Sequence, residues 1–139
     1  MLLFDPSAGQ IADRMAILCL KIQHYKDRGR DTSALEIEGR ACASAFENIR
    51  FPLPCGPQTE ALDDLLGKLR DQHRLLWKAE DDIRALLGKI TSRCAELADL
   101  WEAVDVSRTI SETNDHRAQL VGQIDALFGL TPEEKVYAR

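Results

Sequence analysis

The chain has 139 residues, of which 45% are hydrophobic and 29% charged, and its formal net charge is −5. This length and composition predict one folded domain over residues 1–139 and exclude a disordered chain. An acidic chain is a poor binder of nucleic acid or of an anionic membrane surface, so we expect neither partner.

The chain contains no apolar run approaching the roughly 18 residues of a membrane span. The apolar start Met1–Phe4 is too short for the hydrophobic part of a signal peptide. The four cysteines form no C-x-x-C clip, and none has a histidine nearby at zinc-binding spacing. We therefore expect a cytoplasmic protein with free thiols and without a membrane span.

The first predicted helix begins at Ser7, which forms an S-x-x-Q capping box with Gln10. Its apolar residues recur in steps of four and three from Ile11 to Tyr25, which is typical of a helix that packs in a core. Gly29 is expected to end it.

The second predicted helix starts at Thr32 or Ser33, where Ser33 and Glu36 match another capping box, and continues to about Ile49. The next segment, Phe51–Pro57, contains three prolines and one glycine, which forbid a helix. We expect an ordered crossover between helices there.

The third predicted helix runs from about Thr59 to about Leu87, and Gly88 marks its end or a kink. Its predicted seam repeats in steps of four and three, the spacing of a helix that packs lengthwise against other helices. The seam consists of Leu62, Leu66, Leu69, His73, Leu76, Glu80, Ile83 and Leu87. Because a buried polar group without a partner costs about 1–3 kcal/mol, we expect partners for His73 and Glu80 inside the bundle.

The fourth predicted helix spans about Arg93 to Phe128, with a break expected near Asp105–Ser107 because the span exceeds the usual helix length. Its predicted apolar stripe comprises Leu97, Leu100, Val104, Ser107, Ser111, Asn114, Ala118, Val121 and Phe128. A cap, a proline and two acids at Thr131–Glu134 predict a short C-terminal helix. Since no segment has a strand pattern, the predicted fold is an all-α antiparallel bundle of four main helices plus this short one.

Two polar clusters lie midway along the third and fourth predicted helices, and they would face each other if these helices run antiparallel. The candidate site residues are His73, Trp77, Glu80, Asp81 and Arg84 in the first cluster, and Asn114, Asp115 and Arg117 in the second. One interpretation is register control, in which a buried amide or ion pair stops apolar layers from sliding. A second interpretation is a small-molecule binding site within this polar layer.

A third interpretation is a metal-dependent hydrolase of a phosphorylated small molecule. Glu80, Asp81, Glu112 and Asp115 could supply oxygen ligands to Mg²⁺ or Mn²⁺. The segment Glu112–Asp115 matches the E-x-x-D element of all-α nucleotide pyrophosphohydrolases, but Ile and Arg at positions 83 and 84 replace the acids of their other element. Because no nucleophile motif or P-loop is present, we favour a non-enzymatic protein without catalytic residues, metal or cofactor.

Three segments carry a resemblance. They are Gly9-Gln10 with Asp13-Arg14 and Ile17-Leu18, then Leu76-Trp77 with Glu80-Asp81 and Arg84, and finally Asn114-Asp115 with Arg117. This order resembles an uncharacterised family of short bacterial all-helical proteins with GE-x-x-DK-x-x-IL, LW-x-x-ED-x-x-R and ND-x-R motifs. Gln10 and Arg14 depart from the family pattern. Members often occur near glycosyltransferase genes, so the resemblance implies an accessory role in surface-polysaccharide assembly.

These observations predict a non-enzymatic interaction or accessory module. The aliphatic stripes are broader than one small bundle needs, so we expect a homo-oligomer, and a dimer is the commonest assembly. A different protein partner is the other expected form of interaction.

Overall fold

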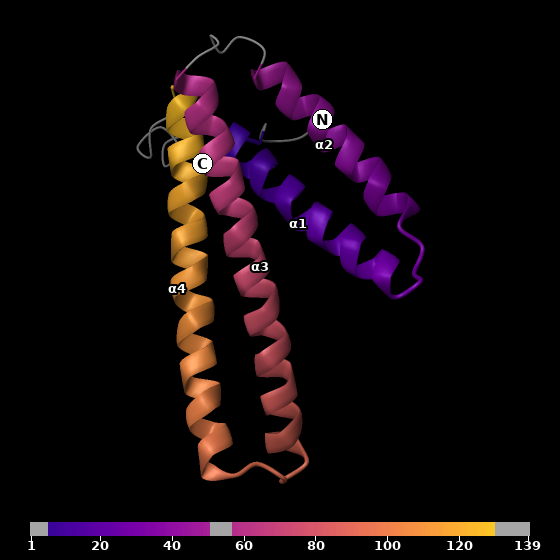
Figure 1. Ribbon diagram of the computed structural model, residues 1–139, viewed down its shortest axis with the longest axis vertical. Coiled ribbons are helices and arrows are strands. Elements are labelled where there is room, and N and C mark those ends of the chain that lie inside the picture. Colours follow the sequence, from indigo (N-terminus) through magenta and orange to yellow (C-terminus); the bar gives the residue numbers. More distant parts are fainter. Residues whose placement is uncertain (1–5, 51–56, 130–139) are drawn as a thin grey trace.

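The computed structural model describes residues 6–50 and 57–129, and this part of the chain is all-α, as predicted. The helices are α1 (Ala8–Asp27), α2 (Ser33–Arg50), α3 (Pro57–Thr91) and α4 (Leu97–Leu127). They form a short antiparallel hairpin, α1–α2, and a much longer one, α3–α4 (Figure 1). None of the described helices combines the length and apolarity needed to cross a membrane.

Two predicted segments lie outside the described residues. They are most of the Phe51–Pro57 crossover, including Cys55, and the short C-terminal helix from Thr131.

The ends of α1 are those predicted from the sequence. Ser7 and Gln10 form the capping box, because the Gln10 amide donates to Ser7 Oγ (3.2 Å) and the Ser7 amide donates to Gln10 Oε1 (2.9 Å). Gly29 follows the C-terminus with a φ of 66°, a left-handed conformation that glycine adopts without strain. Local sequence therefore determines where this helix starts and stops.

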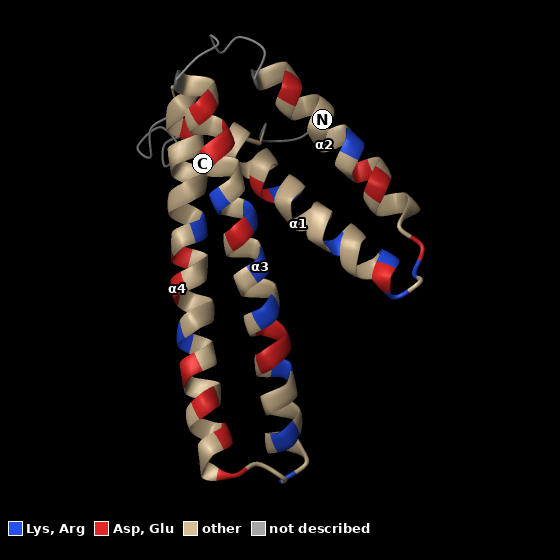
Figure 2. Ribbon diagram, viewed as in Figure 1, with Lys and Arg blue, Asp and Glu red and all other residues tan. Residues whose placement is uncertain are grey.

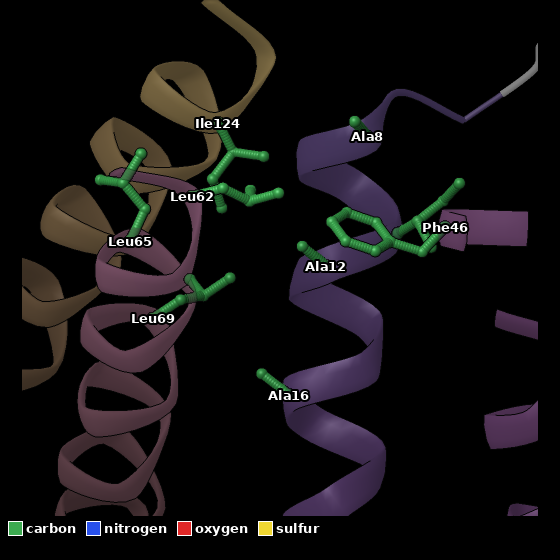
Figure 3. Packing of buried hydrophobic residues seen from close by; sticks show 9 residues of the cluster. Ala8, Ala12, Ala16, Phe46, Leu62, Leu65, Leu69 and Ile124 are labelled. Carbon is green, nitrogen blue, oxygen red and sulfur yellow. The ribbon is translucent and has the colours of Figure 1, made fainter. Parts of the chain in front are cut away.

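Helix α1 lies between α2 and the α3–α4 hairpin, and α2 packs mainly on α1 (Figure 1). Figure 3 shows why α1 approaches the hairpin closely: it presents alanines to the leucines of α3. The residues at this contact are Ala8, Ala12 and Ala16 on α1, and Leu62 and Leu69 on α3, whereas Leu65 points toward α4. Phe46 of α2 completes the core from the other side and meets the Phe128 ring edge-on, with 6.3 Å between ring centroids.

The N-terminus of α1 is fixed to α4 by a buried carboxylate. The Gly9 amide donates to Asp125 Oδ1 (2.7 Å), and Ser7 Oγ donates to Asp125 Oδ2 (3.0 Å). Helix α1 has no acidic residue in its own first turn, so Asp125 supplies the negative charge that a helix N-terminus favours. A Cβ atom on Gly9 would lie 2.4 Å from the Val121 carbonyl oxygen, so only glycine allows this contact.

The predicted seam of α3 is buried or half-buried except at Leu87, which is exposed, and a second series one residue earlier faces α4. In the predicted seam, Leu66, His73, Glu80 and Leu87 alternate with Leu62, Leu69, Leu76 and Ile83. The positions that face α4 and become buried or half-buried are Leu62, Leu65, Leu69, Gln72, Leu76, Ala79, Ile83, Leu86 and Ile90. Both series have heptad spacing, and α4 selects the second one, so Leu87 is 51% exposed while its neighbour Leu86 is 5% exposed.

The predicted apolar stripe of α4 is also wrong in its N-terminal half. The buried and half-buried seam is Asp99, Ala103, Val106, Ile110, Thr113, Arg117, Leu120, Ile124 and Leu127. Leu97, Leu100 and Val104, which head the predicted stripe, are instead exposed. Helix α4 is continuous through Asp105–Ser107, so the expected break is absent from this described helix.

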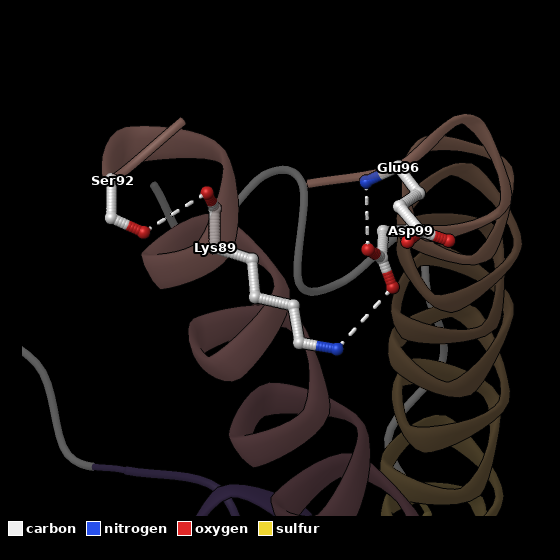
Figure 4. Close-up of polar contacts among 4 residues, drawn as sticks. All are labelled: Lys89, Ser92, Glu96 and Asp99. Carbon is white, nitrogen blue, oxygen red and sulfur yellow. Dashed lines mark hydrogen bonds and ion pairs between the residues drawn. The ribbon is translucent and has the colours of Figure 1, made fainter. Parts of the chain in front are cut away.

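The turn between α3 and α4 lies later in the chain than predicted. Helix α3 continues through Gly88, and α4 begins at Leu97 rather than near Arg93. Figure 4 shows the contact that closes the turn: Asp99 Oδ2 accepts from the Glu96 amide (2.9 Å), and Lys89 Nζ lies 3.3 Å from Asp99 Oδ1. These two partners, the backbone amide first, hold the pKa of Asp99 below its usual value.

Candidate functional site

Three helices meet at a group of polar side chains that we name the polar junction: Asp13 of α1, His73 of α3 and Arg117 of α4. His73 Nε2 lies 2.6 Å from Asp13 Oδ1, and Arg117 Nε lies 3.7 Å from the same oxygen. Because a carboxylate oxygen only accepts hydrogen bonds, the His73 ring nitrogen is the donor. The junction therefore joins α1 to both helices of the long hairpin.

The His73 side chain is only 3% exposed, whereas those of Asp13 and Arg117 are 20% and 33% exposed. The contact of His73 with Asp13 fixes the level at which α1 sits on the hairpin, since sliding by one turn would leave both groups without their partner. The sequence predicted such a polar contact between the third and fourth helices, whereas this one joins α1 to α3.

Trp77 lies one turn beyond the polar junction and stacks on His24 near the end of α1. The two rings are nearly parallel, with 4.4 Å between centroids and 3° between planes. Among the described residues, Trp77 Nε1 and Gln72 Oε1 are the buried side-chain atoms without a hydrogen-bond partner. Each such group carries a desolvation cost of about 1–3 kcal/mol.

Asp13 and Arg117 of the polar junction come from the first and third segments on which the sequence resemblance was based, and Trp77, one turn beyond the junction, comes from the second. His73, Trp77 and Arg117 are among the site residues predicted from the sequence, whereas Asp13 and His24 are not. A charged residue within the apolar run of the first helix was the available signal for Asp13. His24 gave no such signal, because it lies near a helix end among other polar residues.

The other predicted site residues lie away from the junction. Arg84 pairs with Asp81 (2.8 Å) and approaches Glu80 (3.8 Å) along the surface of α3. Asn114 is half-buried, and Asp115 is exposed on α4. The two clusters therefore do not close into a single layer around Glu80 and Asn114.

The carboxylates of the metal interpretation do not converge either. Within residues 6–50 and 57–129, no three His, Cys, Asp or Glu side chains come together as a group that could hold a metal ion. Glu112 and Asp115 are exposed, while Glu80 and Asp81 are engaged by Arg84.

An apolar groove of about 310 Å³ lies between α1 and α2. Met15, Ile22 and Ala43 belong to its lining, and Gly39 contributes no side chain. The acid at the groove, Glu36, is engaged by Lys26 (3.0 Å), which holds the Glu36 pKa below its usual value.

The long hairpin extends well beyond α1. Helix α1 ends at Asp27, close after the His24–Trp77 stack, whereas α3 continues for 14 residues from Trp77 to Thr91. At 1.5 Å per residue this extension is about 21 Å long. We call residues 78–91 and 97–110 the arm; Figure 1 shows it projecting as two helices without a third.

The arm carries most of the large exposed apolar side chains found in the described residues. They form a surface that we name the arm face: Leu87, Leu97, Leu100, Trp101 and Val104. Their exposed fractions range from 44% to 70%. Since Ala103 and Val106 of the same helix face α3, this part of α4 is apolar on two sides.

The arm face continues the surface that α1 covers higher on the hairpin. Leu87 lies two heptads after His73, and Leu100 lies three heptads before Val121, which contacts Gly9. Val104 lies three heptads before Asp125, which binds the N-terminus of α1. In a heptad-packed pair, residues seven apart share a face, so the arm face is the α1-binding face without α1.

Comparison of this chain with protein-family models, with curated proteins and with solved structures finds no match in any of the three.

Proposed function

We propose that this protein is a non-enzymatic interaction module that binds through the arm face, and that two copies associate there as a homodimer. The observation that supports this proposal is the arm face itself. An exposed, contiguous apolar surface on a monomeric protein typically marks an interaction site.

The energetics favour a moderate interaction. Each side chain of the arm face is about half exposed, so complete burial contributes roughly 1 kcal/mol per side chain. For two copies the total is about 10 kcal/mol, which is comparable to the roughly 4–15 kcal/mol cost of association. Apolar burial alone therefore leaves a weak dimer, and polar contacts beyond the arm face must supply the rest.

The polar junction and the arm face have different roles in this proposal. The junction sets the position of α1 on the hairpin, and that position leaves the arm uncovered. An accessory role in surface-polysaccharide assembly is supported by the sequence resemblance alone.

Sedimentation velocity and light scattering over a wide concentration range test the proposal. We expect a dimer for the parent chain and a monomer for the double substitution Leu100→Asn and Val104→Asn. A matched control replaces two exposed apolar residues outside the arm face, Ile37→Asn and Leu75→Asn, and should leave the dimer intact. A parent chain that stays monomeric throughout would contradict the proposal.

A further inference from the structure

We infer that the two copies associate antiparallel, so that the tip of each arm lies beside the α1–α2 turn of its partner. This inference rests on the proposed function, because it specifies the geometry of the same interface. It adds a second contact region outside the arm face, the turn around Arg28 and Arg30.

Steric arrangement favours the antiparallel direction. Heptad spacing places the arm face on the side of α3–α4 that α1 covers nearer the other end. Figure 1 shows the α1–α2 hairpin at that other end, away from the arm tip. If two copies packed parallel, both α1–α2 hairpins would stand between the arms at the same height and hold the arm faces apart. In an antiparallel pair each α1–α2 hairpin lies beyond the end of the partner's arm, and the uncovered segments overlap.

The lengths agree with this arrangement. The uncovered part of α3 extends for about 21 Å beyond Trp77. Two such segments that overlap fully bring the tip of one arm to the level of Trp77 in the other copy. His24 stacks on Trp77, and the α1–α2 turn follows within a few residues, so the tip reaches that turn.

The size of the contact matches a stable interface. The arm comprises two segments of 14 residues, 78–91 and 97–110. One face of these segments together with the six residues of the turn, 26–31, provides about 20 residues per copy. A standard interface of about 800 Å² per partner uses roughly 20–30 residues on each side.

Each end carries exposed charged residues that can pair with residues of opposite charge at the other end. Glu96 and Glu102 are exposed near the tip, and neither has an ion-pair partner among the described residues. Arg28 and Arg30 are exposed at the turn, likewise without an ion pair in the described part of the chain, and Arg30 lies 5.3 Å from the Tyr25 ring centroid. Figure 2 shows acidic residues near the tip of α4, and both basic and acidic residues at the α1–α2 turn, where the acids are Asp27 and Asp31. Asp31 already accepts hydrogen bonds from Ser33, whereas Arg28 and Arg30 are available to Glu96 and Glu102. An antiparallel dimer brings these opposite charges together twice, once at each end.

Charge reversal tests this pairing. We expect Arg28→Glu with Arg30→Glu to raise the dimer dissociation constant by roughly tenfold at low salt, since four surface pairs become repulsive. Adding Glu96→Arg and Glu102→Arg to the same chain should restore the parent value. The matched control Arg70→Glu with Arg74→Glu changes the net charge equally at exposed positions outside the predicted contact. An equal effect of the control and the turn variant would overturn the inference.

The exposed thiol of Cys94, in the turn at the arm tip, provides a second measurement. In the antiparallel dimer the two Cys94 residues lie about 21 Å apart along the arm, beyond the roughly 7 Å between Cα atoms that a disulfide tolerates. A disulfide-linked dimer that forms on mild oxidation and disappears with Cys94→Ser would show a parallel pair and refute the antiparallel geometry. In that case dimerisation through the arm face would still stand, whereas a monomeric parent chain would remove both proposals.

Discussion

The contact between Gly9 and α4 gives the sharpest stability prediction, for the substitution Gly9→Ala. A Cβ atom there would lie 2.4 Å from the Val121 carbonyl oxygen, 2.9 Å from Val121 Cγ1 and 3.0 Å from Asp125 Oδ1. The first of these neighbours is backbone, so no side-chain rotation relieves the clash. Helix α1 must move away from α4 by more than half an ångström.

That movement lengthens the 2.7 Å hydrogen bond from the Gly9 amide to Asp125. Overpacking costs about 1–3 kcal/mol, and loss of a hydrogen bond to a charged group costs about 1.5–3 kcal/mol. The higher helix propensity of alanine offsets about 0.5–1 kcal/mol of this. We therefore expect Gly9→Ala to lower the free energy of unfolding by about 2–4 kcal/mol.

Urea unfolding followed by circular dichroism at one fixed protein concentration measures this change. Gly122→Ala is the matched control, because it lies next to Val121 on α4 and a Cβ atom there meets nothing within 4 Å. The control should gain about 0.5–1 kcal/mol from helix propensity. If Gly9→Ala were as stable as the parent chain, or gained as much as the control, the close approach of α1 to α4 would be refuted.

Three further predictions follow from the seam, the polar junction and the arm tip. Leu86→Ala should lower the unfolding free energy of the monomer by about 2–4 kcal/mol, and Leu87→Ala by less than about 1 kcal/mol, because only Leu86 lies in the α3–α4 seam. Equal losses in urea titrations would contradict the observed register. His73→Leu should lower the unfolding free energy by about 1–3 kcal/mol, because the Asp13 carboxylate loses its donor. Adding Asp13→Ala removes that carboxylate and should recover part of the loss. Strictly additive effects in this double-mutant cycle would argue against the 2.6 Å contact. The lowered pKa of Asp99 means that its stabilisation of the arm tip is complete above the unfolded-chain value of 3.8 and is lost as the pH falls through the lower folded-state value. Amide hydrogen exchange at the arm tip should therefore accelerate as the pH falls below 3.8 in the parent chain but not in Asp99→Asn. Identical pH profiles for the two chains would show that Asp99 is not the cause.

Local rules in the sequence determined the class of the fold and several helix ends. The capping box of Ser7 and Gln10 and the left-handed Gly29 depend only on residues a few positions apart, so they could be predicted from sequence and are confirmed. The absence of strand patterns likewise predicted an all-α chain. The end of α3 was predicted too early, because Gly88 costs a helix only about 1 kcal/mol and the packing against α4 outweighs that cost.

The tertiary structure alone decided which side of each long helix is buried. In α3 two heptad series share four positions, and both carry leucines and polar residues at the other positions, so Leu86 and Leu87 were equal candidates until α4 selected one. In α4 the pattern misled, because Leu97 and Leu100 are larger and more apolar than Ala103, which lies in the seam. Burial depends on where the partner helix lies. A periodic sequence indicates that one of two neighbouring helix faces is buried, but not which one.

The candidate site was likewise determined partly by the sequence and partly by the tertiary packing. His73 could be recognised from sequence because a polar residue in an apolar series demands a partner, but the partner, Asp13, lies 60 residues away and only the packing of α1 brings it within 2.6 Å. The large apolar residues of the arm were visible in the sequence as a core stripe. They form an exposed face because α1 is 20 residues long and α3 is 35, so one helix cannot cover the other.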